Sequence, residues 1–170
     1  MTQAIDAGKR PVTPLAGPYG HPLHPALVTV PIGAWISSIV FDLASLSADR
    51  TRVFTEGAYW LIAIGVLGAL AAALFGFLDL LAIPRGTRAF RTGLIHLALN
   101  LSVTVAFAVS WLLRRGDLDD PDGVAVGLIV LSAIALAALA VSGWLGGKLA
   151  YRYGVRVADE ATQQEGFTPR

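Results

Sequence analysis

Three histidines and one aspartate are the residues of this chain best suited to binding a metal ion, a haem or a proton. His21 and His24 lie three positions apart in the stretch HPLHP, and each precedes a proline. Asp79 and His96 lie inside apolar stretches further along the chain. A neutral imidazole is the commonest metal ligand in proteins and also binds haem iron, and a carboxylate can orient it. These four residues form the candidate cofactor-binding set.

The two prolines of HPLHP predict its local conformation. Because a residue before proline is disfavoured in the α region, we expect both His21 and His24 in an extended, polyproline-like segment. Their side chains would project from the same side, but about 9 Å apart along the axis, which makes joint binding of one ion awkward. A pairing of one of these histidines with His96 is geometrically easier.

Asp79 and His96 are expected at one depth in a membrane. Each lies about four residues from the end of an apolar block, or about 6 Å below the surface at about 1.5 Å per residue. A short link joins the two blocks, so they are expected to be antiparallel neighbours whose polar side chains could meet. Three interpretations stay open: a hydrogen-bonded clasp for the entry segment, a haem or metal site, and proton or ion handling. The clasp is the interpretation that we favour.

The elements that must position these residues are membrane helices. The chain is 55% hydrophobic and 15% charged with a mean hydropathy of +0.63, which is too apolar for an ordinary soluble domain. Backbone in lipid must satisfy its own hydrogen bonds, and the apolar blocks lack the alternation of barrel strands. The predicted fold is therefore an all-α, integral membrane four-helix bundle. Its blocks, each long enough to span about 30 Å of hydrocarbon, are residues 25–45, 57–83, 93–113 and 124–147.

The segments outside the blocks are polar. Residues 1–20 are rich in proline and glycine, and residues 158–170 show no hydrophobic periodicity. We expect both to be mobile tails, which leaves one transmembrane domain over residues 21–157.

Basic residues predict the orientation in the membrane. Nine lysines and arginines fall on the side that carries both termini, and four fall on the other side. Positively charged loops remain in the cytoplasm. Both termini are therefore expected on the cytoplasmic side of a bacterial inner membrane.

Other polar and small residues inside the blocks are expected to support packing between the helices. His96, Asn100 and Thr104 recur at every fourth position and form a polar seam, which could line a water path or hydrogen-bond across the bundle. Small residues also recur at helical spacing over 65–76 and 132–146, where we expect close approach of helix backbones.

Asp42 is a further charged residue inside a block, near the end opposite to the histidines. A buried charge is expensive in a membrane unless it is paired. We expect Asp42 to pair with Arg114 or Arg115, or to cap an adjoining helix, and to have a structural role.

Composition also excludes several classes of function. The chain has no cysteine, which rules out thiolate metal sites and cysteine nucleophiles, and its formal charge of +1 gives no sign of a nucleic-acid partner. No hydrolase, phosphate-binding or nucleophile motif is present, so we do not expect an enzyme. The expected function is that of an accessory or interaction component that contacts the lipid bilayer and a membrane protein partner or second copy. The alternative is a b-type haem or divalent-metal protein for electron transfer, using His21 or His24 with His96.

Four motifs resemble one bacterial family: GHPLHPALVTVPIG, GFLDLL, LIHLALN and SGWLGGKLAYRYGVRV. The family is that of the predicted membrane proteins with domain of unknown function 2231, and the resemblance covers residues 19–157. It implies a small polytopic membrane domain and no established reaction. Many members carry a further histidine at the positions of Thr29 and Tyr153. Any shared site should therefore centre on His21, His24, Asp79 and His96.

Overall fold

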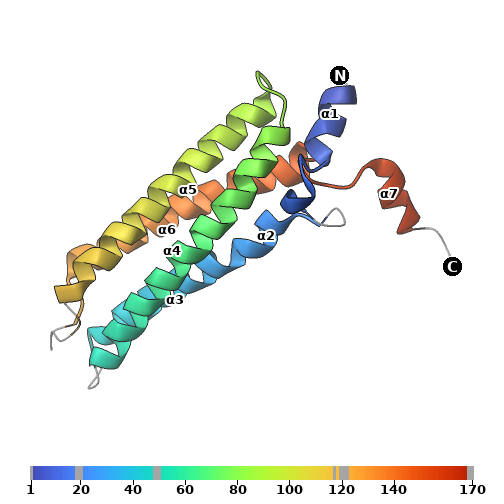
Figure 1. Cartoon of the computed structure of the whole chain (residues 1–170). Coiled ribbons are helices and arrows are strands. Elements are labelled where there is room, and N and C mark those ends of the chain that lie inside the picture. Colours follow the sequence, from blue (N-terminus) through green and yellow to red (C-terminus); the bar gives the residue numbers. More distant parts are fainter. Residues whose placement is uncertain (1, 18–20, 48–50, 117, 119–122, 168–170) are drawn as a thin grey trace.

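The computed structural model describes the whole chain except residues 1, 18–20, 48–50, 117, 119–122 and 168–170. Four long helical segments lie side by side in one elongated bundle (Figure 1). All regular structure in the described residues is helical. The prediction of an all-α membrane bundle is therefore confirmed, and the helices that are long and apolar enough to span a membrane are Leu23–Ser45, Thr51–Ala82, Arg88–Gly116 and Val126–Arg152.

The helices follow each other in an up-and-down order. Helix α4 packs between α3 and α5, and α6 packs against both α5 and α3, so the long helices form a ring. The long helices are α3 (Thr29–Ser45), α4 (Thr51–Ala82), α5 (Arg88–Leu113) and α6 (Val126–Gly147). The short elements are α1 (Thr2–Lys9), η1 (Pro14–Ala16), α2 (Leu23–Leu27), η3 (Arg114–Gly116), the π-helical η4 (Lys148–Arg152) and α7 (Glu160–Glu165).

One end of the bundle, here called the termini end, is formed by α2, the end of α4, the start of α5 and the end of α6. Helices α1 and α7 both lie at this end (Figure 1). They fall within the segments expected to be mobile tails, and the mobility of those tails stays a prediction. Between α4 and α5 the chain reverses over a few residues, where Gly86 adopts a φ of 81° and the Thr87 hydroxyl accepts a hydrogen bond from the Phe90 N–H at 3.1 Å. This cap starts α5 and makes it antiparallel to α4.

The HPLHP stretch is not extended throughout. His24 and Pro25 lie inside α2, and the residue with extended dihedrals is Pro22, which precedes the helix. A proline in the first turn costs no hydrogen bond, because the first N–H groups of a helix have no acceptor within it. The prediction of an extended His24 was therefore wrong. The helix is interrupted only at Val28, shortly before Pro31, whose missing N–H cannot serve the carbonyl four residues earlier.

A central apolar layer fills the middle of the bundle with residues from all four long helices. The indole of Trp35 stacks on the ring of Phe107 with a centroid distance of 4.3 Å, and its Nε1 donates to the carbonyl of Ile62 at 3.3 Å. Burial of these large side chains is the main source of packing energy at this level. The layer consists of Trp35, Ile62, Val103, Phe107 and Ala135.

The glycines of α4 make room for side chains rather than for a neighbouring backbone, which differs from the expected close backbone approach. A Cβ at Gly65 would lie 2.2 Å from the Trp35 indole nitrogen, and one at Gly76 would lie 2.8 Å from Nδ1 of His24. The flat rings of α2 and α3 therefore fit only because these positions carry no side chain.

Candidate functional site

The first component of the site is His24, at the termini end of the bundle. Its Nδ1 lies 2.8 Å from the backbone carbonyl oxygen of Ala72 in α4. A carbonyl oxygen can only accept, so Nδ1 must carry the hydrogen. This bond fixes both the tautomer and the orientation of the imidazole, and it ties α2 to α4.

His96 makes a corresponding bond on the other side of the bundle. Its Nδ1 donates to the carbonyl oxygen of Ser142 in α6 at 2.8 Å, and the Ser142 hydroxyl lies 3.0 Å from the same nitrogen. The Asn100 amide donates both to Nε2 of His96 at 3.1 Å and to the His96 carbonyl oxygen at 2.9 Å. A Cβ at Gly146 would lie 3.1 Å from the ring, so this glycine leaves the space that the imidazole occupies. Both ring nitrogens of His96 therefore have a protein partner.

The two imidazoles meet between the helices. Their centroids are 6.1 Å apart and their planes are at 88°, an edge-to-face contact. The prediction that His96 contacts the HPLHP segment is confirmed, and the residue that it meets is His24. His21 does not join this pair: it is exposed and lines a cavity together with Lys9 and Arg10.

Asp79 binds an arginine rather than a histidine. Its Oδ1 lies 2.8 Å from Nε of Arg156, and both side chains are largely buried. Arg156 also donates from its backbone N–H to the Gly8 carbonyl at 2.9 Å and from Nη2 to the Ala16 carbonyl at 3.3 Å. The residue has a φ of 60°, a left-handed conformation that costs a side-chain-bearing residue about 1–2 kcal/mol. These contacts offset that strain and join the segments at both termini to the end of α4.

Sequence reasoning missed Arg156. The signal was available in the last motif, where GVR follows the final apolar block and places a basic residue close to the membrane boundary. What the sequence could not show is that a buried carboxylate from a helix far away in the chain lies within reach.

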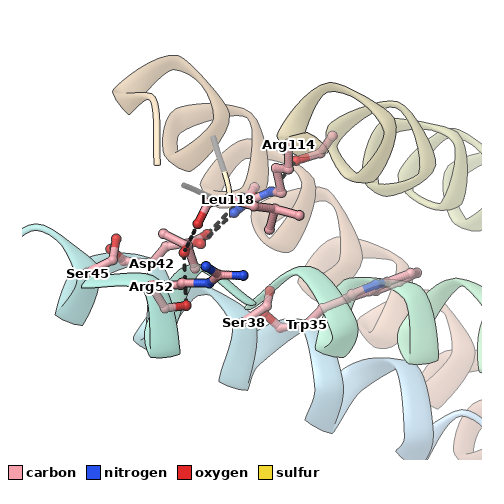
Figure 2. A network of polar contacts seen from close by, with 10 residues as sticks. Trp35, Ser38, Asp42, Ser45, Arg52, Arg114 and Leu118 are labelled. Atoms are coloured by element: carbon pink, nitrogen blue, oxygen red, sulfur yellow. Dashed lines mark hydrogen bonds and ion pairs between the residues drawn. The ribbon is translucent and has the colours of Figure 1, made fainter. Parts of the chain in front are cut away.

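A second polar cluster lies at the opposite end of the bundle (Figure 2). The Arg114 guanidinium donates to the two carboxylate oxygens of Asp42 at 2.5 and 2.8 Å, and the side chains are 2% and 0% exposed. Arg114 also donates to the hydroxyls of Ser110 at 3.1 Å and Ser132 at 3.3 Å. The predicted pairing of Asp42 with one of two arginines is confirmed for Arg114, whereas Arg115 is exposed. The two-pronged bond to Asp42 joins α3 to the end of α5, and the bond to Ser132 adds α6.

The sequence profile of the DUF2231 family, described as predicted membrane proteins, matches residues 20–159. The chain belongs to the DUF2231 family. No curated protein and no solved structure matches it. The DUF2231 match includes all four membrane-spanning segments, both paired histidines and the Asp79–Arg156 ion pair, but it leaves out α1.

Thr29 and Tyr153 stand at the two positions where the family resemblance leads us to expect a histidine in other members. Thr29 is exposed at the start of α3, where its hydroxyl donates to the carbonyl of Ala26 at 2.7 Å. The ring of Tyr153 lies 5.6 Å from the ammonium nitrogen of Lys148, a cation–π contact. Both side chains therefore have other roles here.

The donor set of this DUF2231 chain does not favour a haem or metal site. Among the residues that the structure describes, no group of three or more histidine and acidic side chains could hold a metal ion. Of the paired imidazoles, His96 already uses its Nε2 for the amide of Asn100, and Asp79 is bound to Arg156.

Within the polar seam of α5, His96 bonds across the bundle to Ser142 in α6, whereas Thr104 bonds within its own helix. The Thr104 hydroxyl donates to the Asn100 carbonyl at 2.8 Å, so its hydrogen bond stays within α5. Val103 and Phe107 of the same helix belong to the central apolar layer. The seam therefore supports hydrogen bonding, within α5 and across to α6, better than a water path through the membrane.

Proposed function

We propose that this DUF2231 protein is a non-enzymatic, multi-pass component of a bacterial inner membrane, an accessory or interaction subunit whose histidine and aspartate cluster is structural. One observation carries the proposal: each paired imidazole gives its Nδ1 hydrogen to the backbone carbonyl of a different helix. A group whose polar atoms are used to join helices is typical of a clasp, because a catalytic or ligand-binding group keeps a polar atom directed at its substrate.

The clasp joins all parts of the termini end. His24 links α2 to α4, His96 links α5 to α6, and Arg156 links α4 to the segments around Gly8 and Ala16. A bundle fixed in this way presents a defined surface to a partner. The polar groups at the two ends are separated by the central apolar layer, which disfavours a pore or a proton path as the function.

The orientation with both termini in the cytoplasm belongs to this proposal, and the nine-to-four distribution of basic residues supports it. A reporter enzyme that is active only in the periplasm tests it directly. Fused after Arg170, the reporter should be inactive, and fused in the loop between the first two spans it should be active. The reverse pattern would overturn the orientation.

The structural role of His96 is tested with a pair of substitutions. Asparagine places an amide nitrogen close to the position of Nδ1, so His96→Asn can still donate to the Ser142 carbonyl, whereas His96→Ala cannot. We expect His96→Ala to lower the free energy of unfolding by about 1–3 kcal/mol and His96→Asn to recover part of that loss. Equal losses in the two variants would argue against the clasp.

The same proteins separate the clasp from the haem or metal alternative. An absorption spectrum of the purified wild type, with metal analysis in parallel, should show no Soret band and no stoichiometric metal. A Soret band that disappears in both His96→Asn and His96→Ala would overturn the proposal, since neither substitution leaves an imidazole to bind iron.

An interaction role requires a protein partner at the termini end. Tyr151 is 93% exposed there, and Leu67 is 68% exposed in the middle of α4. A photo-crosslinking residue at position 151 should give a discrete protein adduct in cells, while the same residue at position 67 should give mainly lipid adducts. Lipid adducts alone at both positions would contradict the interaction role.

A further inference from the structure

A cavity of about 490 Å³ opens at the termini end, and Arg156 of the clasp lines it. Its walls come from α1, from His21 and Pro22 before the first span, and from residues 156–159 after the last span. Pro22 is followed directly by the first membrane-spanning segment. The cavity therefore lies at the boundary of the membrane, and its volume is within the range of about 300–1,000 Å³ that is usual for small-molecule sites.

The lining includes one buried cation, Arg156, whose guanidinium has hydrogen-bond donors that are not in use. The Arg156 side chain is only 5% exposed, forms an ion pair with Asp79 through Nε without a well-aligned hydrogen bond, and donates from Nη2 to the Ala16 carbonyl. In the described part of the chain its Nη1 makes no hydrogen bond. A guanidinium carries five N–H donors in a planar fork that matches the oxygens of a phosphate.

Three further donors line the same cavity. Lys9 and Arg10 lie at the end of α1 and directly after it, and His21 is exposed opposite them. None of the three forms an ion pair with a described acidic residue. Four groups that can donate to one anion therefore surround a single concave space, which is typical of a phosphate site.

Two carboxylates, those of Asp6 and Asp159, also line the cavity and restrict the charge that a ligand can carry. Asp159 accepts the Thr162 N–H at 2.8 Å as the N-cap of α7, so one of its oxygens is in use, whereas Asp6 makes no such bond. A multiply charged anion would be repelled by these carboxylates. A ligand that also carries a cationic hydrogen-bond donor would satisfy both signs of charge.

We propose that this cavity binds a zwitterionic phosphate ester with a primary ammonium group, of which phosphoethanolamine is the simplest. Lys9, Arg10 and Arg156 bind its phosphate, and Asp6 binds its ammonium group. The ligand can be a phosphatidylethanolamine headgroup or a free phosphoethanolamine. Because the cavity lies where the first span meets the membrane surface, the lipid is the source that the structure favours.

The experiment uses the full chain in detergent with mixed lipids, followed by mass analysis of the lipids that stay bound. Phosphatidylethanolamine should be retained in preference to phosphatidylglycerol and phosphatidylcholine. The double substitution Lys9→Gln with Arg10→Gln should reduce that retention about tenfold, because two charge-assisted bonds are lost. The control Arg85→Gln with Arg88→Gln removes the same charge from the same end of the bundle outside the cavity, and should leave retention unchanged.

Asp6→Asn tests the ammonium contact without altering the phosphate donors. It should reduce the preference for phosphatidylethanolamine over phosphatidylglycerol, while the total phospholipid retained stays the same. Free phosphoethanolamine that displaces the lipid, or that raises thermal stability in lipid-poor detergent, would identify the soluble source and support the same site.

Three results would overturn the proposal. Phosphatidylglycerol bound as well as or better than phosphatidylethanolamine would indicate a general basic surface. An equal loss in the Arg85/Arg88 control would locate binding outside the cavity. A wild type that retains none of the three lipids and is not stabilised by phosphoethanolamine would exclude the site altogether.

Discussion

The buried pair of Asp42 and Arg114 gives the sharpest prediction, and the perturbation is Arg114→Met. The two side chains are 0% and 2% exposed, and they join α3 to the end of α5 through two short hydrogen bonds. Removing one partner leaves the other charge buried and unpaired, which costs about 3–5 kcal/mol in proteins. We expect a loss of that size in the free energy of unfolding, and a similar loss for Asp42→Leu.

The double variant Asp42→Leu with Arg114→Met should be far less damaging than either single change. Both charges are then absent, and apolar replacement of a buried pair is often neutral or stabilising. The hydroxyls of Ser110 and Ser132 lose a donor each, which costs about 1 kcal/mol or less per bond. We therefore expect the double variant within about 2 kcal/mol of wild type, and a coupling energy of about 4 kcal/mol or more between the two sites.

The assay is equilibrium unfolding in mixed detergent micelles, followed by tryptophan fluorescence. Arg115→Met is the matched control, because it makes the same substitution at the next residue, where the side chain is exposed and lies 5.5 Å from the Trp111 ring. Loss of that contact should cost about 0.5–1 kcal/mol. A single Arg114 variant that is no less stable than the Arg115 control would refute the reasoning, and so would a double variant whose loss equals the sum of the single losses.

Three other changes have definite expected outcomes. Gly76→Ala should lower the free energy of unfolding by about 1–3 kcal/mol, because the new methyl group lies 2.8 Å from the imidazole of His24. The control Gly143→Ala meets no atom within 4 Å and should be neutral or slightly stabilising. Chemical unfolding compares the two variants. Arg156→Met should destabilise the termini end and loosen the segment at Ala16, because it leaves the Asp79 carboxylate without its cation and removes the side-chain donor to the Ala16 carbonyl. Hydrogen exchange at the N-terminal segment measures this loosening. The Thr162 N–H, which donates to Asp159, holds the pKa of that carboxyl below its ordinary value of 3.8. The cap therefore stabilises α7 fully above pH 3.8, and this stabilisation is lost as the pH falls through the lowered pKa. NMR of the Thr162 N–H follows the loss, and Asp159→Asn should not show it.

The fold and the membrane assignment could be predicted because they depend on local composition. A helix needs only about 20 apolar residues in sequence to span a bilayer, and the pairing of Asp42 follows from the high energy of an unpaired charge in lipid. The choice of Arg114 over Arg115 could not be predicted, since adjacent residues differ by about 100° around a helix and the helix packing decides which one faces inward.

The local conformation at His24 could not be predicted from its sequence neighbours alone. A residue before proline disfavours the α region, which is a local effect. His24 is nevertheless helical, and its side chain forms a tertiary hydrogen bond to the carbonyl of Ala72 in this conformation. Arg156 was missed for a related reason: its partners Asp79, Gly8 and Ala16 are distant in the sequence and meet only when the bundle closes.

The two ends of the bundle are held by different chemistry, and that difference bears on where a partner acts. At the end of Asp42 and Arg114 a fully buried charge pair is bonded within itself and to the hydroxyls of Ser110 and Ser132, so opening it would expose unpaired charges to lipid. The termini end also has a largely buried ion pair, between Asp79 and Arg156, but there the two imidazoles form hydrogen bonds to backbone carbonyls and their rings are half-buried. Hydrogen bonds of half-buried groups near the membrane surface can be exchanged for water at low cost. The imidazole contacts are therefore the part of the termini end that can adjust when it meets a lipid headgroup or a protein, while both ion pairs hold the helices in register.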